Sequence, residues 1–366
     1  MNIAIIDADL IGRKSHRFPN LACMKLSAYY KTSKNNVVLE RNYDNLYNYD
    51  KILISKVFTD TFVPGDVLKM DNVEYGGTGF YYDKAPKLPD KIEHIFPDYH
   101  LYDEYVQSEI NRGINANKFK EYMDMSIGFA TRGCIRQCKF CVNQNYTKAS
   151  THSRIEEFFD PSRKYICLLD DNIFACKDWK SIFDELIATG HKFQFKQGMD
   201  ERLLTEEKCD YLFNKANYYG DYTFAFDNIN DRPIIEKKLQ MIREFTSRQC
   251  RFYLFCGFNH DKPGIYSEEF WKQDIVDMFE RIRILMKYKC IPYIMRYKDY
   301  ELSPHRGIYI TVARWCNQVN MFKKKSFREF CNLCGENSSA MRYLQEFEKE
   351  HIDIATEYFD IKFMDK

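Results

Sequence analysis

The first hundred residues alternate short apolar runs with amphipathic stretches. Strands are predicted at four such runs, residues 2–6, 37–39, 51–54 and 71–75. The first run is short, apolar and β-branched, which is typical of a parallel strand buried on both faces. Residues 21–30 then place apolar positions at helical spacing. This order of strand, helix and strand predicts a small α/β domain over residues 1–115.

From residue 125 onward, strand-like and helix-like segments alternate. The predicted strands are residues 126–130, 165–169, 193–197, 222–226, 252–256 and 291–295. The predicted helices between them include residues 179–188, 205–216, 234–245 and 270–287, and Thr205 precedes Glu206 and Glu207 as an N-cap. Six such units predict a parallel sheet with helical cover, either a partial (βα)6 barrel or an open doubly wound sheet. The hydrophobic pattern alone does not choose between them.

Two further features divide the chain. Pro86, Pro89 and Pro97, with charged residues between them, indicate a linker ahead of the six units. After about residue 300 the pattern is helical, over residues 307–330 and 339–358. We therefore expect three parts: residues 1–115, the core at 116–302, and a helical C-terminal extension at 303–366.

Composition and charge exclude several classes of protein. The 366 residues are 45% hydrophobic and 29% charged, as in ordinary globular proteins, and the net charge of +1 produces no field that favours nucleic acid or an anionic membrane. No window approaches the roughly 18 apolar residues that span a bilayer, and the N-terminus does not read as a signal peptide. The 13 cysteines, an odd number, favour a reducing compartment over a disulfide framework. We therefore expect a cytoplasmic protein without membrane partners.

Three of these cysteines lie close together. Cys134, Cys138 and Cys141 form a CxxxCxxC pattern just after the first core strand. With this cysteine content, chance would produce such a triplet in roughly 0.02 of sequences of this length. A cubane iron-sulfur cluster normally takes four thiolates, so three thiolates from one loop leave one iron open to another ligand.

The CxxxCxxC pattern, with Phe140 directly before the third cysteine, resembles the signature loop of the radical S-adenosylmethionine (SAM) enzymes. The resemblance implies a partial (βα)6 barrel with this loop after its first strand. It also implies a [4Fe-4S] cluster on which SAM is cleaved to a 5′-deoxyadenosyl radical, and a reductant such as flavodoxin or ferredoxin. The substrate could be a peptide, a metabolite or a nucleobase.

Polar residues follow the predicted strands, where ligands gather in parallel α/β folds. These candidates for SAM binding are Asp170, Asp171, Gln197, Arg202, Asp227, Gly257 and Arg296. The resemblance implies that Asp170 or Asp171 meets the SAM amino group, that Asp227 and Gly257 meet the ribose, and that the Phe140 backbone meets the adenine. Arg202 is the candidate for the SAM carboxylate. Alternatively, the acids cap helices and Arg202 pairs with Glu206, four residues on.

The first domain lies ahead of the cysteine loop in the sequence. In this position it resembles the Rossmann-like cobalamin-binding domain of many radical SAM proteins. That family's cobalt-ligand motif has a His two residues after an Asp, whereas this chain reads Asp7-Ala8-Asp9 after its first strand, and His16 is the nearest histidine. We therefore expect the domain not to bind cobalamin. A cobalamin-dependent methyltransferase remains the alternative within the enzyme class.

Other metal chemistry stays open. The three loop cysteines could hold zinc or a labile cluster in a protein that is not an enzyme. Cys331 and Cys334 form a second CxxC, which with Cys316 could hold an auxiliary cluster or zinc. The remaining cysteines fit buried apolar positions. His191, His260 and His305 have no partners at ligand spacing and receive no role.

Overall fold

A computed structural model describes residues 1–13 and 18–363, so His16 lies outside the described residues. The chain divides into two compact units. The first contains residues 1–171 and 176–194, and the second contains residues 172–175 and 195–366. Among the described residues, no helix combines the length and the apolar character needed to cross a bilayer. The three-part division expected from the sequence stays a prediction.

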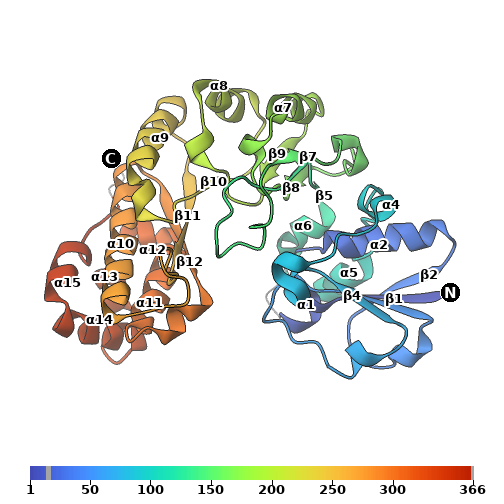
Figure 1. The fold of residues 1–366 in the computed structure, drawn as a ribbon, viewed down its shortest axis with the longest axis horizontal. Helices are drawn as coiled ribbons and strands as arrows, with labels where there is room; N and C mark the ends of the chain where they lie inside the picture. Colours follow the sequence, from blue (N-terminus) through green and yellow to red (C-terminus); the bar gives the residue numbers. More distant parts are fainter. Residues whose placement is uncertain (14–17, 364–366) are drawn as a thin grey trace. The chain divides into compact units, whose positions relative to one another are not determined.

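The first unit begins with a parallel four-stranded sheet in the order β2-β1-β3-β4 (Figure 1). Its strands are β1 (Asn2–Asp7), β2 (Asn36–Glu40), β3 (Lys51–Ser55) and β4 (Val73–Gly76). Ile5 of β1 pairs with Leu39 on one side and Leu53 on the other, so β1 is central. All four predicted strands are confirmed.

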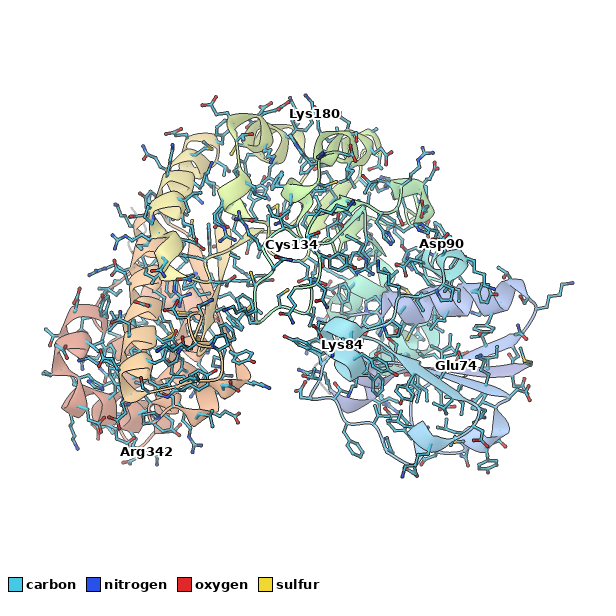
Figure 2. The ribbon with its side chains drawn as sticks, viewed as in Figure 1. Glu74, Lys84, Asp90, Cys134, Lys180 and Arg342 are labelled. Atoms are coloured by element: carbon cyan, nitrogen blue, oxygen red, sulfur yellow. The ribbon has the colours of Figure 1, made fainter. Side chains whose placement is uncertain are left out.

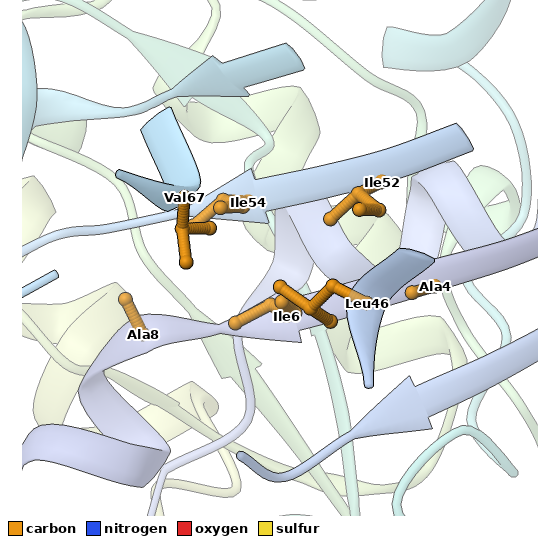
Figure 3. Packing of buried hydrophobic residues seen from close by; sticks show 7 residues of the cluster. All are labelled: Ala4, Ile6, Ala8, Leu46, Ile52, Ile54 and Val67. Carbon is orange, nitrogen blue, oxygen red and sulfur yellow. The ribbon is translucent and has the colours of Figure 1, made fainter. Parts of the chain in front are cut away.

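The core of this sheet explains why residues 3–6 of β1 are all apolar. Ala4 and Ile6 are fully buried on one face, with Ile52 and Ile54 of β3 beside them (Figure 3). Leu46 and Val67, from the connecting segments, cover the same face. A strand with packing on both faces has no position for a polar side chain until it ends, here at Asp7.

Short helices and one long helix accompany this sheet. They are α1 (Ala8–Gly12), α2 (Leu21–Thr32), α3 (Thr78–Tyr81), α4 (Asp90–Glu93), α5 (Asp103–Asn111) and α6 (Lys120–Met123). Asn20 caps α2 by accepting from the N–H groups of Ala22 and Cys23. Helix α2 packs on β1, β2 and β3, which confirms the predicted helix over residues 21–30.

The first unit also holds a three-stranded sheet in the order β5-β8-β9 and a two-stranded ribbon. These elements are β5 (Met125–Gly128), β8 (Tyr165–Leu168), β9 (Lys192–Phe195), the ribbon strands β6 (Thr131–Arg132) and β7 (Ser150–Thr151), and helix α7 (Trp179–Ala188). Strands β5 and β8 are parallel, and β6 and β7 are antiparallel.

The second unit contains a parallel sheet in the order β10-β11-β12. Its elements are β10 (Tyr222–Ala225), β11 (Cys250–Cys256), β12 (Ile291–Arg296), α8 (Glu206–Cys209) with a π-helical continuation (Asp210–Lys215), α9 (Arg232–Phe245) and α10 (Glu268–Lys287). The Thr205 hydroxyl accepts from the Lys208 N–H, so the predicted N-cap is confirmed.

Five α-helices follow β12 among the described residues and confirm the helical character predicted after residue 300. They are α11 (Arg306–Cys316), α12 (Val319–Lys324), α13 (Phe327–Leu333), α14 (Ser339–Glu350) and α15 (Ile352–Tyr358). Helix α11 packs on β12 and on α14. The side-chain amide of Asn317 donates to the Ile294 carbonyl and accepts from its N–H, which satisfies the edge of β12 as a neighbouring strand would.

The chain is thus an α/β protein with several parallel sheets and C-terminal helices. All six predicted core strands are present, but one continuous partial barrel is not confirmed. In the part of the chain that the structure describes, the strands form two sheets of three. Beyond the end of β9, Met199 makes an isolated parallel bridge to Phe224.

Candidate functional site

The three clustered cysteines lie on a loop that is closed at its base. The loop follows β5, and its two ends pair as the ribbon of β6 and β7, with Thr131 opposite Thr151. Cys134, Cys138 and Cys141 form no disulfide and are partly exposed, and Figure 2 labels Cys134 on this loop. The cysteines predicted to be apolar core residues are all buried. The loop therefore presents three partly exposed cysteines from one short segment.

The loop backbone is shaped around these sulfurs. Gly133 has φ +95°, and a Cβ there would lie 2.3 Å from the Lys148 carbonyl oxygen, so only glycine fits. The Arg136 N–H donates to Cys134 Sγ and the Asn143 N–H donates to Cys141 Sγ, both at 3.4 Å. Backbone N–H groups of the loop thus point at two of its three sulfurs.

Asp171 ties the two ends of the loop together. One carboxylate oxygen accepts from the Gly133 N–H and the other from the Asn143 side-chain amide, each at 2.7 Å. Burial raises the pKa of Asp171, while the Gly133 N–H acts in the opposite direction. This carboxylate therefore positions the cysteine loop.

Asp170 holds the strand that leads into the loop. Its carboxylate accepts from the Ala130 N–H at 3.1 Å, and from the N–H and hydroxyl of Thr131, each at 2.7 Å. The side chain is buried, and burial raises its pKa to about 7 despite these bonds. Both acids thus form hydrogen bonds to the loop. The contact of Asp170 or Asp171 with the SAM amino group stays a prediction.

Residues from the N-terminal part of the same unit also reach the loop. The Tyr82 hydroxyl donates to the Phe140 carbonyl at 2.7 Å. The side-chain amide of Gln144 donates to the Asp83 carboxylate at 3.1 Å, and that of Asn145 donates to the Asp83 carbonyl at 3.0 Å. Phe140 was expected to present its backbone to adenine, and its carbonyl oxygen already accepts one hydrogen bond. The loop is therefore braced at two points outside the six core units.

In the second unit, Arg202 lies between two acids. Its guanidinium donates to Asp200 at 2.8 Å and to Asp231 at 2.6 Å. The alternative prediction, an ion pair between Arg202 and Glu206, is therefore wrong. The guanidinium pairs instead with Asp200, which follows β9, and Asp231, which follows β10. These carboxylates raise the pKa of Arg202 further above its ordinary value, against the effect of burial. A permanent positive charge is thus fixed near the strand ends.

Glu201, beside Arg202, was not singled out from the sequence. It is fully buried, one carboxyl oxygen accepts from the Ala225 N–H at 3.3 Å, and the other has no hydrogen-bond partner among the described residues. Burial, with Asp200 beside it, raises the pKa of Glu201 to about 8. The side chain is therefore a neutral carboxylic acid at pH 7. No periodicity or motif distinguishes it from the charged residues on either side.

Asp227 lies at the end of β10 beside a buried arginine. The Phe255 N–H donates to its carboxylate at 3.2 Å. The Arg281 guanidinium donates to the carbonyls of Phe226, Asp227 and Phe255, each at 2.9 Å. Burial raises the pKa of Asp227 to about 6, while Arg281 and Arg202 act in the opposite direction. The second unit thus brings Arg202 and Asp227 into one electrostatic cluster.

The last three predicted residues are placed separately. Gly257 has φ +78°, and its N–H donates to Asp274 at 2.7 Å. Arg296 is exposed, with its guanidinium 4.5 Å from the Tyr300 ring centroid, and lines a cavity of about 350 Å³ with β12 and α11 residues. Gln197 is exposed.

The second CxxC lies apart from these residues in the sequence. Its Cys331, and Cys316 upstream, are buried, and burial raises the pKa of Cys331 to about 12.

Comparison with known proteins adds little to these observations. No protein-family model matches the chain, and no curated protein matches it. Among solved structures, the cobalamin-dependent S-adenosylmethionine radical enzyme OxsB, with aqua-cobalamin bound, aligns over 98% of this chain and 56% of its own length. The sequence identity is 11% and the TM-score is 0.34. The chain spans about half the length of that structure, and a similarity of this size assigns no function to it.

Proposed function

We propose that this protein is a radical SAM enzyme whose [4Fe-4S] cluster is held by Cys134, Cys138 and Cys141. The observation that carries the proposal is the cysteine loop itself. Three partly exposed thiols lie on a loop closed by an antiparallel ribbon, with backbone N–H groups aimed at two of the sulfurs.

The donor set fits the cluster. Three thiolates match three of the four irons of a cubane, and a glycine in the left-handed region lets the backbone turn tightly before the first cysteine. When bound, such a cluster with SAM on its open iron supplies one-electron cleavage of the sulfonium to a 5′-deoxyadenosyl radical. The task of the protein is to hold the loop, bind SAM and the substrate, and exclude water.

The acids after β8 hold the loop. Asp170 fixes residues 130–131 and Asp171 fixes Gly133 and Asn143, so the sulfurs start from a defined backbone. Three of these four hydrogen bonds come from backbone N–H groups and one from the Asn143 amide, so a change in either acid would alter the loop backbone or its contact with Asn143. We assign both residues positioning roles, and we propose that one of the two, Asp170 or Asp171, also contacts the SAM amino group.

The polar residues of the second unit supply the other groups that SAM needs. SAM carries a carboxylate, which requires donors or cations, and ribose hydroxyls, which require polar partners. Arg202 is proposed for the carboxylate and Asp227 with Gly257 for the ribose; Gln197 and Arg296 complete the polar rim. The six core strands are proposed to form one partial (βα)6 barrel. The family resemblance implies a reductant such as flavodoxin or ferredoxin, and the proposed substrate is a peptide, a metabolite or a nucleobase.

The first domain is proposed not to bind cobalamin, because its own residues pack together beyond the C-terminal ends of its strands. The buried Asp9 carboxylate accepts from the Val57 N–H at 2.7 Å and from the Thr61 hydroxyl at 2.5 Å. Gly77 and Gly79 lie against Lys56, where an added Cβ would contact its atoms at 2.3 and 2.7 Å. A cobalamin-dependent methyltransferase, the alternative, would require this packing to open.

The experiment that tests the proposal compares Cys138→Ala with Cys334→Ala, a partly exposed thiol outside the loop. Each protein is reconstituted anaerobically, reduced with dithionite and given SAM, and 5′-deoxyadenosine is measured. Cys138→Ala is expected to abolish 5′-deoxyadenosine formation, whereas Cys334→Ala keeps the parent rate. Parent-level formation by Cys138→Ala would show that the loop has another role. One zinc without iron or sulfide in the parent, lost in Cys138→Ala, would favour the non-enzymatic zinc protein.

A further inference from the structure

Two histidines far apart in the sequence face each other in the C-terminal helices. His305 directly precedes α11 and His351 directly follows α14, and their Nε2 atoms lie 3.2 Å apart. Glu350, the last residue of α14, places a carboxylate oxygen 3.9 Å from His305 Nε2. All three belong to the second unit, and their ligand atoms lie within 4.8 Å of one another.

The packing around these side chains orients them before any ligand binds. The His305 ring meets the Phe347 ring edge to face at 5.0 Å between centroids, and Phe347 lies 4.8 Å from His351. Gly307 allows α11 and α14 to approach closely, because a Cβ there would lie 2.1 Å from the Tyr343 ring. The His305 side chain is 13% exposed, so its position is largely fixed by packing.

We propose that His305, His351 and Glu350 form a binding site for a divalent transition-metal ion, with Zn²⁺ as the best-matched ion. Imidazole nitrogen and carboxylate oxygen are the donors that Zn²⁺ takes in sites with two His and one Glu. This site is separate from the cysteine loop and does not depend on the proposed radical SAM function.

The spacing of the two imidazoles fits one shared ion. Zn–N bonds of about 2.0–2.1 Å, placed on two nitrogens 3.2 Å apart, give an N–Zn–N angle of about 100–106°, close to tetrahedral. A tetrahedral oxygen ligand would lie about 3.4 Å from each nitrogen. The Glu350 oxygen, 3.9 Å from His305 Nε2 and within 4.8 Å of the His351 nitrogen, therefore has to move closer to both. The Glu350 side chain is 64% exposed and is therefore able to rotate.

Three protein ligands leave a fourth position for water or a small ligand. A cavity of about 190 Å³ adjoins the site and is lined by His305 and Glu350, with Glu346 and Arg306 at its polar edge. The ion would also lie at the C-terminal end of the 12-residue helix α14, where the helix dipole favours a cation. The ion would link the residue that precedes α11 to the two residues at the C-terminal end of α14.

A hydrogen bond between two neutral imidazoles explains the same spacing without a metal. In that case one ring donates and the other accepts, and Glu350 has no part in the arrangement. The two explanations differ in what they predict for Glu350, which makes this residue the discriminating position.

The test is titration of Zn²⁺ into full-length, cluster-reconstituted protein, with stoichiometry by elemental analysis and affinity by calorimetry. The variants are His305→Gln with His351→Gln, Glu350→Gln, and a Cys134→Ala, Cys138→Ala, Cys141→Ala triple variant. His100→Gln serves as the control, because His100 is an imidazole 81% exposed and paired only with Asp103 at 2.8 Å in the ion pairs of the described residues. Circular dichroism checks folding, and Co²⁺ absorption reports the donor type.

The parent, the triple cysteine variant and His100→Gln are expected to bind one Zn²⁺ that the double histidine variant does not bind. Glu350→Gln should weaken binding at least tenfold and remove the rise in thermal midpoint that Zn²⁺ causes in the parent. Co²⁺ in the triple cysteine variant should show d–d bands without thiolate charge transfer. Unchanged stoichiometry and affinity in the double variant would overturn the proposal. If that variant does not fold, unchanged affinity in Glu350→Gln would overturn it.

Discussion

Asp171 lies 2.7 Å from the backbone N–H of Gly133, the residue that immediately precedes the first loop cysteine. The same carboxylate accepts from the Asn143 amide, two residues beyond the last cysteine. A single side chain from the end of β8 thus joins both ends of the cysteine segment. The stability of the loop, and with it metal retention, should depend on this carboxylate.

Asp171→Ala should therefore lower iron retention after anaerobic reconstitution. It removes two hydrogen bonds to a charged acceptor, each worth about 1.5–3 kcal/mol, and leaves the Gly133 N–H without its partner. Asp171→Asn should recover part of the loss, since its carbonyl oxygen can still accept from Gly133. Asp184→Ala, on the exposed face of α7, is the control. Equal iron content in Asp171→Ala and the control would contradict the role given to Asp171.

Gly133→Ala should disrupt the loop more than the same change at Gly113. Both glycines have φ near +90°, at +95° and +90°, so both substitutions bring the same backbone strain, about 1 kcal/mol or somewhat more. Only Gly133 also faces a carbonyl oxygen at 2.3 Å, whereas nothing lies within 4 Å at Gly113. Iron content per chain is the measurement. Similar iron content in the two variants would mean that close packing at Gly133 is unimportant.

Glu201→Gln should change the pH dependence of stability. The folded protein keeps the Glu201 proton up to about pH 8, whereas the unfolded chain releases it near pH 4.5. A raised carboxyl pKa means that the folded state binds more protons, so Glu201 costs stability as pH rises from 4.5 to 8. The cost reaches about 3 kcal/mol at pH 7.

The variant lacks this titration, so its stability relative to the parent should be similar near pH 4.5 and should grow toward pH 8. Denaturant unfolding at a series of pH values measures the difference. A difference that stays constant over this range would show that Glu201 ionises normally.

The first domain should not retain cobalamin. Asp9 bonds to Thr61, and two glycines pack on Lys56, beyond the C-terminal ends of the strands of its sheet. Protein incubated with aqua-cobalamin and desalted should show no corrinoid absorption. Stoichiometric retention would contradict this expectation and favour the methyltransferase alternative.

The elements of this fold could be predicted from sequence because each strand carries a local signal. An uninterrupted apolar run such as residues 3–6 has to be buried on both faces, and Thr205 followed by two acids begins a helix in the structure as expected. Whether β9 and β10 pair could not be predicted, because strand pairing depends on contacts between distant residues. The structure ends β9 at Phe195, ahead of the bridge at Met199.

In the candidate site, too, local features could be predicted from the sequence and contacts between distant residues could not. The cysteine spacing is local and identified the loop, but the partners of the charged residues are not local. Arg202 binds Asp231 rather than Glu206, and Glu201 becomes a neutral acid only because the fold buries it. The pairing of His305 with His351, 46 residues apart, leaves no spacing signal in the sequence.

The central claim is that three cysteines hold a cubane with one iron open to SAM. Electron paramagnetic resonance of the anaerobically reconstituted, dithionite-reduced protein tests it most directly, recorded with and without SAM. We predict one reduced [4Fe-4S] cluster per chain, lost in Cys138→Ala, whose signal changes when SAM is added. A protein with no cluster signal, or with a signal that SAM leaves unchanged, would contradict the account.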